Sequence, residues 1–133
     1  MSAICTCGQE RHLYYRRDGT VFHGDPNAAA LAWARSFGDA DRRRVAVNSL
    51  WNGVFVSTVS LGMDHNWGGG PPLIYETMAF HTSDQHDPQE RYSTEAEALA
   101  GHRKMVARYR WDIRAAVAAL LHLARALAAK RRR

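Results

Sequence analysis

The chain contains little cysteine and little lysine. Its 133 residues include two cysteines, Cys5 and Cys7, which are one residue apart. A disulfide between such close neighbours would be strained, and two cysteines are too few for a disulfide scaffold. Only Lys104 and Lys130 are lysines, so arginine supplies nearly all of the 18 basic residues.

Several enzyme and membrane signatures are also absent. No apolar run is long enough for a membrane span, and no segment has the pattern of a signal peptide. We find no serine nucleophile elbow, Cys–His signature, HExxH helix or phosphate-binding loop with its lysine. These absences predict a cytoplasmic protein with no membrane span and no cofactor. Whether it is an enzyme stays open, and a binding protein is favoured.

The composition is that of a globular protein, with 46% hydrophobic and 23% charged residues. We expect a single domain over residues 1–133, with a mobile tail at 1–10 and an amphipathic helix with a basic tail at 112–133. The formal net charge of +5 favours anionic partners, although an arginine-rich protein from a GC-rich genome would have the same charge. Cys5, Cys7 and His12 could be half of a zinc site, but a second ligand pair is missing and we predict no metal.

The first part of the chain predicts a hairpin and a helix. Residues 12–22 contain the turn pair Asp18-Gly19 between β-forming residues, which is typical of a hairpin. Asp25-Pro26 has the pattern of a helix start, and Gly38 is expected to end that helix.

The second part predicts three strands and then helices. Strands are expected at 42–50, 54–63 and 73–80, with Asn52-Gly53 as a two-residue turn between the first two. Thr94 and Glu97 form a capping box that begins a helix, and Trp111-Asp112 could kink or restart it. The fold class is therefore α+β, a small antiparallel sheet in the order ββαβββα with helices packed on it and an extra C-terminal helix.

The two-residue turn also predicts a register. It places Ser49 opposite Val56 and Val47 opposite Thr58, and both faces of the sheet are then apolar. The helices can cover only one apolar face well, so the other must be shielded from solvent by a further element. The candidates are the N-terminal hairpin, the C-terminal helix and another subunit.

The C-terminal helix carries an apolar stripe at helical spacing. Three interpretations remain open: packing in the core, a dimer-forming helix, and a basic helix on a membrane surface. The stripe consists of Ile113, Val117, Leu120, Leu121, Ala124 and Leu127.

The loop DHNWGGGPP joins the last two strands and concentrates unusual residues. Asp64-His65 and Glu76 could perform acid–base chemistry or bind a metal, with His81 and the acidic and histidine residues of 84–87 as further ligands. Their spacing matches no established metal motif, and Asp64 could instead cap the turn.

The same loop could bind an anion or a partner. Gly68 to Gly70 would expose backbone N–H groups, with aromatic residues for stacking and arginines as cations. Alternatively, the glycines serve only the geometry of the loop. The predicted binding residues are Asp64, His65, Asn66, Trp67, Gly68, Gly69, Gly70, Tyr75, Glu76 and Arg91. Nucleic acid would instead use Arg42, Arg43, Arg44, Lys130, Arg131, Arg132 and Arg133.

Two long blocks, VSTVSLGMDHNWGGGPPLIYETMAF and RYSTEAEALAGHRKMVARYR, carry a family resemblance, with weaker matches at RRDGT, LAWARSF and RRRVAV. Over residues 15–110 the chain resembles a family of small, uncharacterised bacteriophage and prophage proteins. The resemblance implies a compact domain acting inside a bacterial cell, and no known activity. HTSDQHDPQ, the cysteines and the C-terminal helix depart from the family pattern, so a shared chemistry of His81, His86, Cys5 or Cys7 is in doubt.

These observations predict a phage-encoded, non-enzymatic accessory protein. Its partner would be a host or defence protein or an anionic nucleotide ligand. Its biological role would be the inhibition of bacterial immunity. Two alternatives stay open, a DNA- or RNA-binding protein and a metal-dependent hydrolase at Asp64 and His65. Homodimer formation is open as well.

Overall fold

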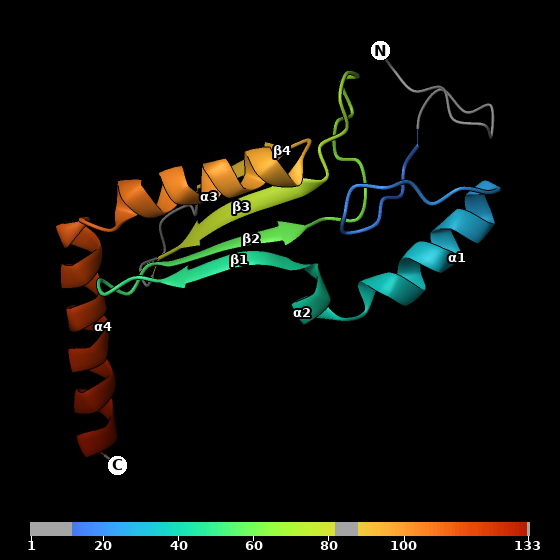
Figure 1. The fold of residues 1–133 in the computed structure, drawn as a ribbon. Helices are drawn as coiled ribbons and strands as arrows, with labels where there is room; N and C mark the ends of the chain where they lie inside the picture. The colour runs from blue at the N-terminus through green and yellow to red at the C-terminus, as the bar shows by residue number, and fades with distance from the viewer. Residues whose placement is uncertain (1–11, 82–87, 133) are drawn as a thin grey trace.

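The computed structural model describes residues 12–81 and 88–132. Its centre is a four-stranded antiparallel sheet with the strands in the order β1-β2-β3-β4 (Figure 1). The strands are β1 (Arg44–Ser49), β2 (Phe55–Ser60), β3 (Tyr75–Phe80) and β4 (Gln89–Tyr92). Helices α1 (Pro26–Phe37) and α2 (Ala40–Arg43) precede the sheet, and α3 (Glu95–Tyr109) and α4 (Ile113–Arg131) follow it. The predicted α+β class, an antiparallel sheet with helices packed on it, is confirmed.

The order of the elements differs from the predicted ββαβββα. Residues 12–22 do turn at Gly19, but they form the isolated bridges Tyr14↔Met63 and Tyr15↔Val21 rather than strands. The additional strand is β4, which is not among the predicted strands. Residues 82–87 and the predicted tail at 1–10 lie outside the described residues.

Helix α3 covers one face of the sheet. The predicted capping box is present, because Thr94 Oγ1 accepts from Glu97 N while the Glu97 carboxylate accepts from Thr94 N. Ala98, His102 and Met105 repeat at helical spacing, and all three are buried. The sheet side of this interface consists of Val54, Val56, Thr58, Tyr75, Thr77 and Ala79, which are also buried.

The hairpin between β1 and β2 differs from the prediction by one residue. Leu50 N donates to Val54 O at 2.8 Å, and Gly53 N donates to Leu50 O at 3.1 Å. The loop therefore holds three residues instead of two, and its last residue, Gly53, has a φ of 83°.

This one-residue difference changes which residues of the two strands share a face, since the prediction put Val47 and Val56 on one face and the structure puts them on opposite faces. The structure pairs Ser49 with Phe55, whereas the prediction paired Ser49 with Val56. Since successive side chains of a strand point to opposite faces, Val56 faces α3. Val47 and Phe55 lie on the other face, where they remain 41% and 37% exposed.

Helix α4 leaves the sheet at a corner and extends away from it (Figure 1). The predicted restart is present, because the Asp112 carboxylate caps α4 by accepting from Arg114 N and Ala115 N. Ala115 is the one buried residue of α4, and it packs with Val54 and Met105. Core packing, one of the three interpretations of the α4 stripe, is therefore wrong for the rest of this helix.

Candidate functional site: an arginine pocket

A basic pocket lies where the N-terminal segment meets α1, α2 and the end of β2. Its volume is about 470 Å³, within the usual range for small-molecule sites. We call it the arginine pocket, and it is lined by Tyr15, Arg16, Arg17, Phe22, Ser36, Phe37, Arg42, Arg43, Ser60 and Gly62.

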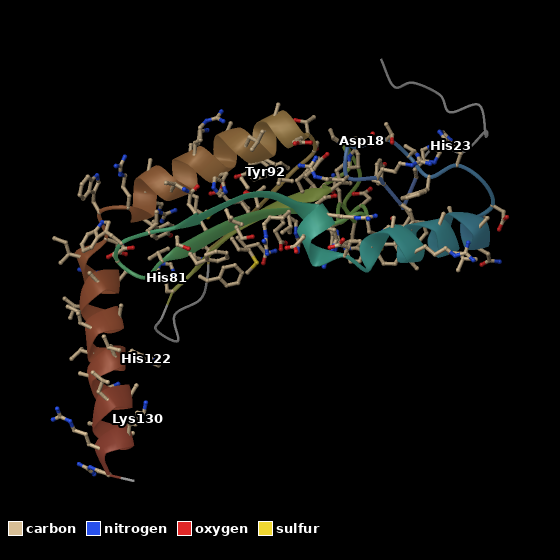
Figure 2. All side chains as sticks on the ribbon, turned by 60° about the horizontal axis from the view of Figure 1, so that its bottom comes forward. Asp18, His23, His81, Tyr92, His122 and Lys130 are labelled. Atoms are coloured by element: carbon tan, nitrogen blue, oxygen red, sulfur yellow. The ribbon has the colours of Figure 1, made fainter. Side chains whose placement is uncertain are left out.

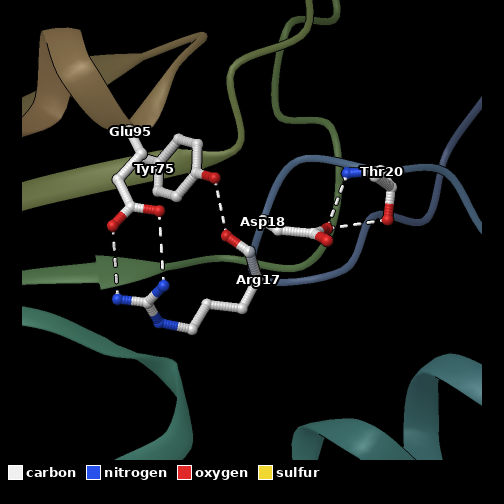
Figure 3. A network of polar contacts seen from close by, with 5 residues as sticks. All are labelled: Arg17, Asp18, Thr20, Tyr75 and Glu95. Carbon is white, nitrogen blue, oxygen red and sulfur yellow. Dashed lines mark hydrogen bonds and ion pairs between the residues drawn. The ribbon is translucent and has the colours of Figure 1, made fainter.

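The N-terminal side of the pocket is anchored to the sheet and to α3 (Figure 3). Tyr75 donates its hydroxyl hydrogen to the Arg17 carbonyl at 2.6 Å, and burial raises the pKa of this hydroxyl, so that it remains a donor. The Arg17 guanidinium forms two hydrogen bonds of 3.3 Å with the Glu95 carboxylate. These contacts hold residues 15–22 in place although they form no strand.

The turn beside Arg17 is closed by a carboxylate (Figure 3). Asp18 Oδ1 accepts from Thr20 Oγ1 at 2.7 Å and from Thr20 N at 2.9 Å. The hydrogen bonds from Thr20 lower the pKa of Asp18, so its charged form is favoured. The Asp18 carboxylate is thus engaged in the turn and is not part of the pocket lining.

Gly62 belongs to the pocket lining and has no room for a side chain. It accepts a hydrogen bond from Tyr15 N at 2.9 Å and has a φ of 66°. A Cβ at this position would lie 2.6 Å from Trp33 Nε1 and 2.9 Å from the Phe37 ring. The close approach of the loop to α1 therefore requires glycine.

Two of the pocket arginines are stacked on phenylalanine rings. The Arg16 Cζ lies 4.4 Å from the centroid of Phe22, and the Arg43 Cζ lies 4.0 Å from the centroid of Phe37. Such cation–π contacts hold a guanidinium in place while leaving N–H groups at its edge. Arg16 Nη1 already donates to the Val21 carbonyl at 2.6 Å, and the remaining N–H groups of the two guanidiniums are ordered hydrogen-bond donors.

The charge of the pocket is only partly balanced. Arg17 pairs with Glu95 at 3.3 Å, and Arg42 pairs with Asp39 at 3.1 Å. Within the described residues, neither Arg16 nor Arg43 forms an ion pair, and the buried Nε of Arg43 has no hydrogen-bond partner. Carboxylates outside the lining thus pair two of its four arginines, and the pocket keeps the positive charge of the other two.

The chemistry of this lining suits an anion. Guanidinium groups bind phosphate or carboxylate oxygens in pairs of hydrogen bonds, and the hydroxyls of Ser36 and Ser60 add polar contacts. The lining has no His, Cys, Asp, Glu or Lys, which are common acids, bases and nucleophiles in enzymes.

In the predicted DHNWGGGPP site, unlike in the arginine pocket, the polar side chains bond to the loop itself. Asp64 is the first of them. This residue is only 2% exposed, and its Oδ1 accepts from Asn66 N at 2.7 Å and from Leu73 N at 3.0 Å. The alternative that Asp64 caps the turn is thus confirmed.

The other polar groups of this loop also bond to its own backbone. His65 Nδ1 donates to the Met63 carbonyl at 2.9 Å, and Asn66 Nδ2 donates to the Pro71 carbonyl at 2.8 Å. Trp67 is 74% exposed, and Gly68, Gly69 and Gly70 are exposed beside it. An accessible tryptophan and glycine backbone remain at the tip of the loop.

Tyr75, Glu76 and Arg91 are not gathered around that tip. Tyr75 is 1% exposed and packs in the core beneath the N-terminal segment, so its ring is not an open stacking surface. Glu76 follows it and points to the other face of the sheet, where its carboxylate accepts from Arg91 Nε at 2.9 Å.

The predicted nucleic-acid residues fall into two groups. Arg42 and Arg43 line the arginine pocket, and Arg44 pairs with Asp41 at 3.1 Å. Lys130, Arg131 and Arg132 are exposed at the end of α4, while Arg133 lies outside the described residues. Figure 2 shows Asp18, next to the pocket, and Lys130 at opposite ends of the molecule. The two groups do not form one continuous basic surface.

A polar network joins α3 to β1, β2 and β3, and it is buried except at Asn48 on β1, which is exposed. His102 Nε2 donates to Asn48 Oδ1 at 2.8 Å, and its Nδ1 accepts from the Thr58 hydroxyl at 2.8 Å. Thr58 in turn bonds to Thr77 at 2.7 Å. Burial, with a smaller contribution from the charge of Arg103, lowers the pKa of His102. Since His102 is 4% exposed and both threonines are fully buried, we interpret the network as a contribution to the stability of the fold.

The described residues contain no group of three or more His, Cys, Asp or Glu side chains placed to hold a metal. Asp84, His86, Asp87, Cys5 and Cys7 lie outside those residues. No family model, curated protein or solved structure matches the chain, and the resemblance to phage proteins stays a prediction.

Of the ten residues that line the pocket, only Arg42 and Arg43 were among the candidates from the sequence. The eight others include the arginines Arg16 and Arg17 and the stacking rings of Phe22 and Phe37. The available signal was a second arginine pair, Arg16-Arg17, beside the predicted Asp18-Gly19 turn, in addition to Arg42-Arg43 at the start of a predicted strand. Nothing in the sequence indicated that these two pairs would line one pocket.

Proposed function

We propose that the protein acts by binding rather than catalysis, and that its ligand is a nucleotide-sized anion bearing phosphate, held in the arginine pocket. The observation that carries this proposal is the lining of four arginines without a carboxylate. Two of these guanidiniums, Arg16 and Arg43, are oriented by phenylalanine rings and have no ion-pair partner in the described part of the chain.

The size and the mixed character of the pocket support this class of ligand. A volume of about 470 Å³ accommodates more than a single inorganic phosphate. The phosphates would bind Arg16 and Arg43, and the less polar part would lie near Tyr15 and Phe22. In a phage accessory protein, capture of a nucleotide used by the bacterial immune response would be a non-enzymatic means of inhibition.

Thermal unfolding with a ligand panel tests the proposal. The panel contains adenosine, inorganic phosphate, mono-, di- and triphosphate nucleosides and cyclic dinucleotides. At about 100 times its Kd, a ligand that binds only the folded state adds about 2.7 kcal/mol to the free energy of unfolding. We expect stabilisation by a phosphorylated nucleotide and none by adenosine. Indifference to every phosphorylated ligand would contradict the proposal.

The same protein can be titrated with labelled DNA and RNA to separate this function from nucleic-acid binding. Binding through the basic residues would weaken steeply with salt and would decrease when Lys130–Arg133 are deleted. Pocket binding predicts that this deletion leaves nucleotide affinity unchanged, because the tail and the pocket are at opposite ends (Figure 2).

A further inference from the structure

Helix α4 exposes an unusual amount of apolar surface. Five large side chains of its stripe are half or more exposed: Ile113, Val117, Leu120, Leu121 and Leu127, with values of 71%, 50%, 66%, 53% and 56%. Contiguous apolar surface of this kind commonly marks an interaction site in a soluble domain.

The start of α4 is fixed to the body of the protein. Asn52 Nδ2 donates to the carbonyls of Tyr109 at 2.7 Å and Asp112 at 3.1 Å. Trp51 Nε1 donates to the Arg110 carbonyl at 2.6 Å. All three bonds reach from the β1–β2 turn to the corner between α3 and α4. They set the direction in which α4 extends (Figure 1).

The stripe faces away from this attachment. An α-helix advances by about 100° per residue, so Ala115 and Val117 are about 160° apart around the axis. Ala115 is buried against the core, whereas Val117 and its neighbours in the stripe are exposed. A flat surface could therefore contact the stripe along the whole helix without meeting the sheet or α3.

The charges around the stripe are all of one sign. From residue 113 to 132 the chain has no Asp or Glu, while Arg114 and Arg125 border one edge of the stripe. Lys130 and the following arginines end the helix, and the corner before it presents Trp111, which is 70% exposed. An apolar stripe with basic borders and an interfacial tryptophan is typical of helices that lie on anionic membranes.

A second copy of the chain fits this helix less well. Antiparallel pairing about Leu120 would place Arg114 beside Arg125 of the other copy, twice in each dimer, with no acidic residue of α4 to offset them. The stripe also spans only two heptads, which is short for a coiled coil. The charge pattern therefore favours an anionic surface over another α4.

We propose that α4 is a membrane-docking helix that lies in the surface of an anionic lipid bilayer, with its stripe inserted and its arginines at the headgroups. Docking of this kind is peripheral. No helix in the described part of the chain is long and apolar enough to cross a membrane. The proposal is independent of ligand binding in the arginine pocket.

Co-sedimentation of the full chain with vesicles tests it. Vesicles of phosphatidylcholine alone are compared with vesicles in which half of the lipid is phosphatidylglycerol, at low and high salt. We expect binding to the anionic vesicles that weakens with salt. The double variant Leu120→Gln/Leu127→Gln should bind about tenfold more weakly. The control Leu31→Gln alters an exposed leucine of α1 (54%) and should bind normally.

Other outcomes would overturn the proposal. One is the absence of binding to anionic vesicles, and another is an equal loss in Leu31→Gln and the stripe variant. A third is a stable dimer in solution that the stripe variant dissociates without any vesicle binding, which would make a second copy the occupant. Circular dichroism shows whether each variant is folded. Docking also predicts a blue shift of tryptophan fluorescence when vesicles are added, and this shift should be smaller in Trp111→Phe.

Discussion

The DHNWGGGPP loop and the arginine pocket both contain many polar side chains, but these side chains have different partners. In the loop, Asp64, His65 and Asn66 bond to the backbone of the loop itself. In the pocket, Arg16 and Arg43 stack on phenylalanine rings and have no carboxylate partner within the described residues, although Arg16 Nη1 also donates to the Val21 carbonyl at 2.6 Å. The polar groups of the loop satisfy its own backbone and stabilise its structure, whereas the two guanidiniums keep further N–H donors and a charge that no carboxylate pairs, and these are available to a ligand.

The largest effect is expected for Asp64→Ala, which tests the structural role of the loop residues. The substitution leaves the N–H groups of Asn66 and Leu73 without this acceptor, and we expect it to lower the free energy of unfolding by about 3 kcal/mol. Asp64→Asn keeps an acceptor oxygen and should lose about 1 kcal/mol. Urea denaturation measures both. An unchanged stability of Asp64→Ala would remove the contrast between loop and pocket.

A pair of glycine substitutions compares the two regions directly. Gly62 and Gly69 have similar φ values, 66° and 85°, so alanine is strained at both positions by about 1 kcal/mol. At Gly62 the new Cβ would also collide with Trp33 and Phe37, whereas at Gly69 nothing lies within 4 Å. We expect losses of about 2 kcal/mol for Gly62→Ala and about 1 kcal/mol for Gly69→Ala in the same urea experiment. Equal losses would mean that the pocket lining relaxes freely.

The pH dependence of the free energy of unfolding tests the role of His102, which joins α3 to the sheet. The pKa of His102 lies below its ordinary value of 6.5 in the folded protein, so the unfolded chain takes up this proton first as the pH falls. The free energy of unfolding should therefore be highest above pH 6.5 and should decrease below it, by up to about 1.4 kcal/mol per pH unit until the folded pKa is reached. The decrease should be smaller in His102→Gln. Identical slopes for the two proteins would contradict the assignment.

The smallest effect is expected for Trp67→Ala at the tip of the loop. Trp67 is 74% exposed and is not among the residues that line the arginine pocket. We expect the free energy of unfolding to change by less than about 0.5 kcal/mol and nucleotide affinity to stay the same. Weaker nucleotide binding in this variant would indicate that the DHNWGGGPP loop takes part in ligand binding.

Local signals in the sequence predicted local structure well. The capping box of Thr94 and Glu97, the turn at Asp18-Gly19 and the helix start at Asp25-Pro26 are all present. Each of these depends on hydrogen bonds within a few residues, which the sequence specifies directly.

The errors concern features that depend on distant residues or on a single added loop residue. Asn52-Gly53 was correctly placed in a turn, but the Asn52 side chain bonds to the corner between α3 and α4, and the loop holds three residues instead of two. The added residue changes which residues of β1 and β2 share a face of the sheet. The α4 stripe has the same spacing as a core-facing helix, so its exposure could not be predicted from periodicity. The arginine pocket combines segments that are far apart in the sequence.

The most direct test of the pocket is the Kd of the strongest nucleotide ligand for two arginine variants. Arg43→Gln removes a stacked charge of the lining, whereas Arg35→Gln removes an exposed charge of α1 outside it. Isothermal titration should show binding about 30-fold weaker for Arg43→Gln, equivalent to about 2 kcal/mol, and nearly unchanged for Arg35→Gln. Equal affinities of the two variants, with both proteins folded, would contradict the assignment of the ligand to the arginine pocket.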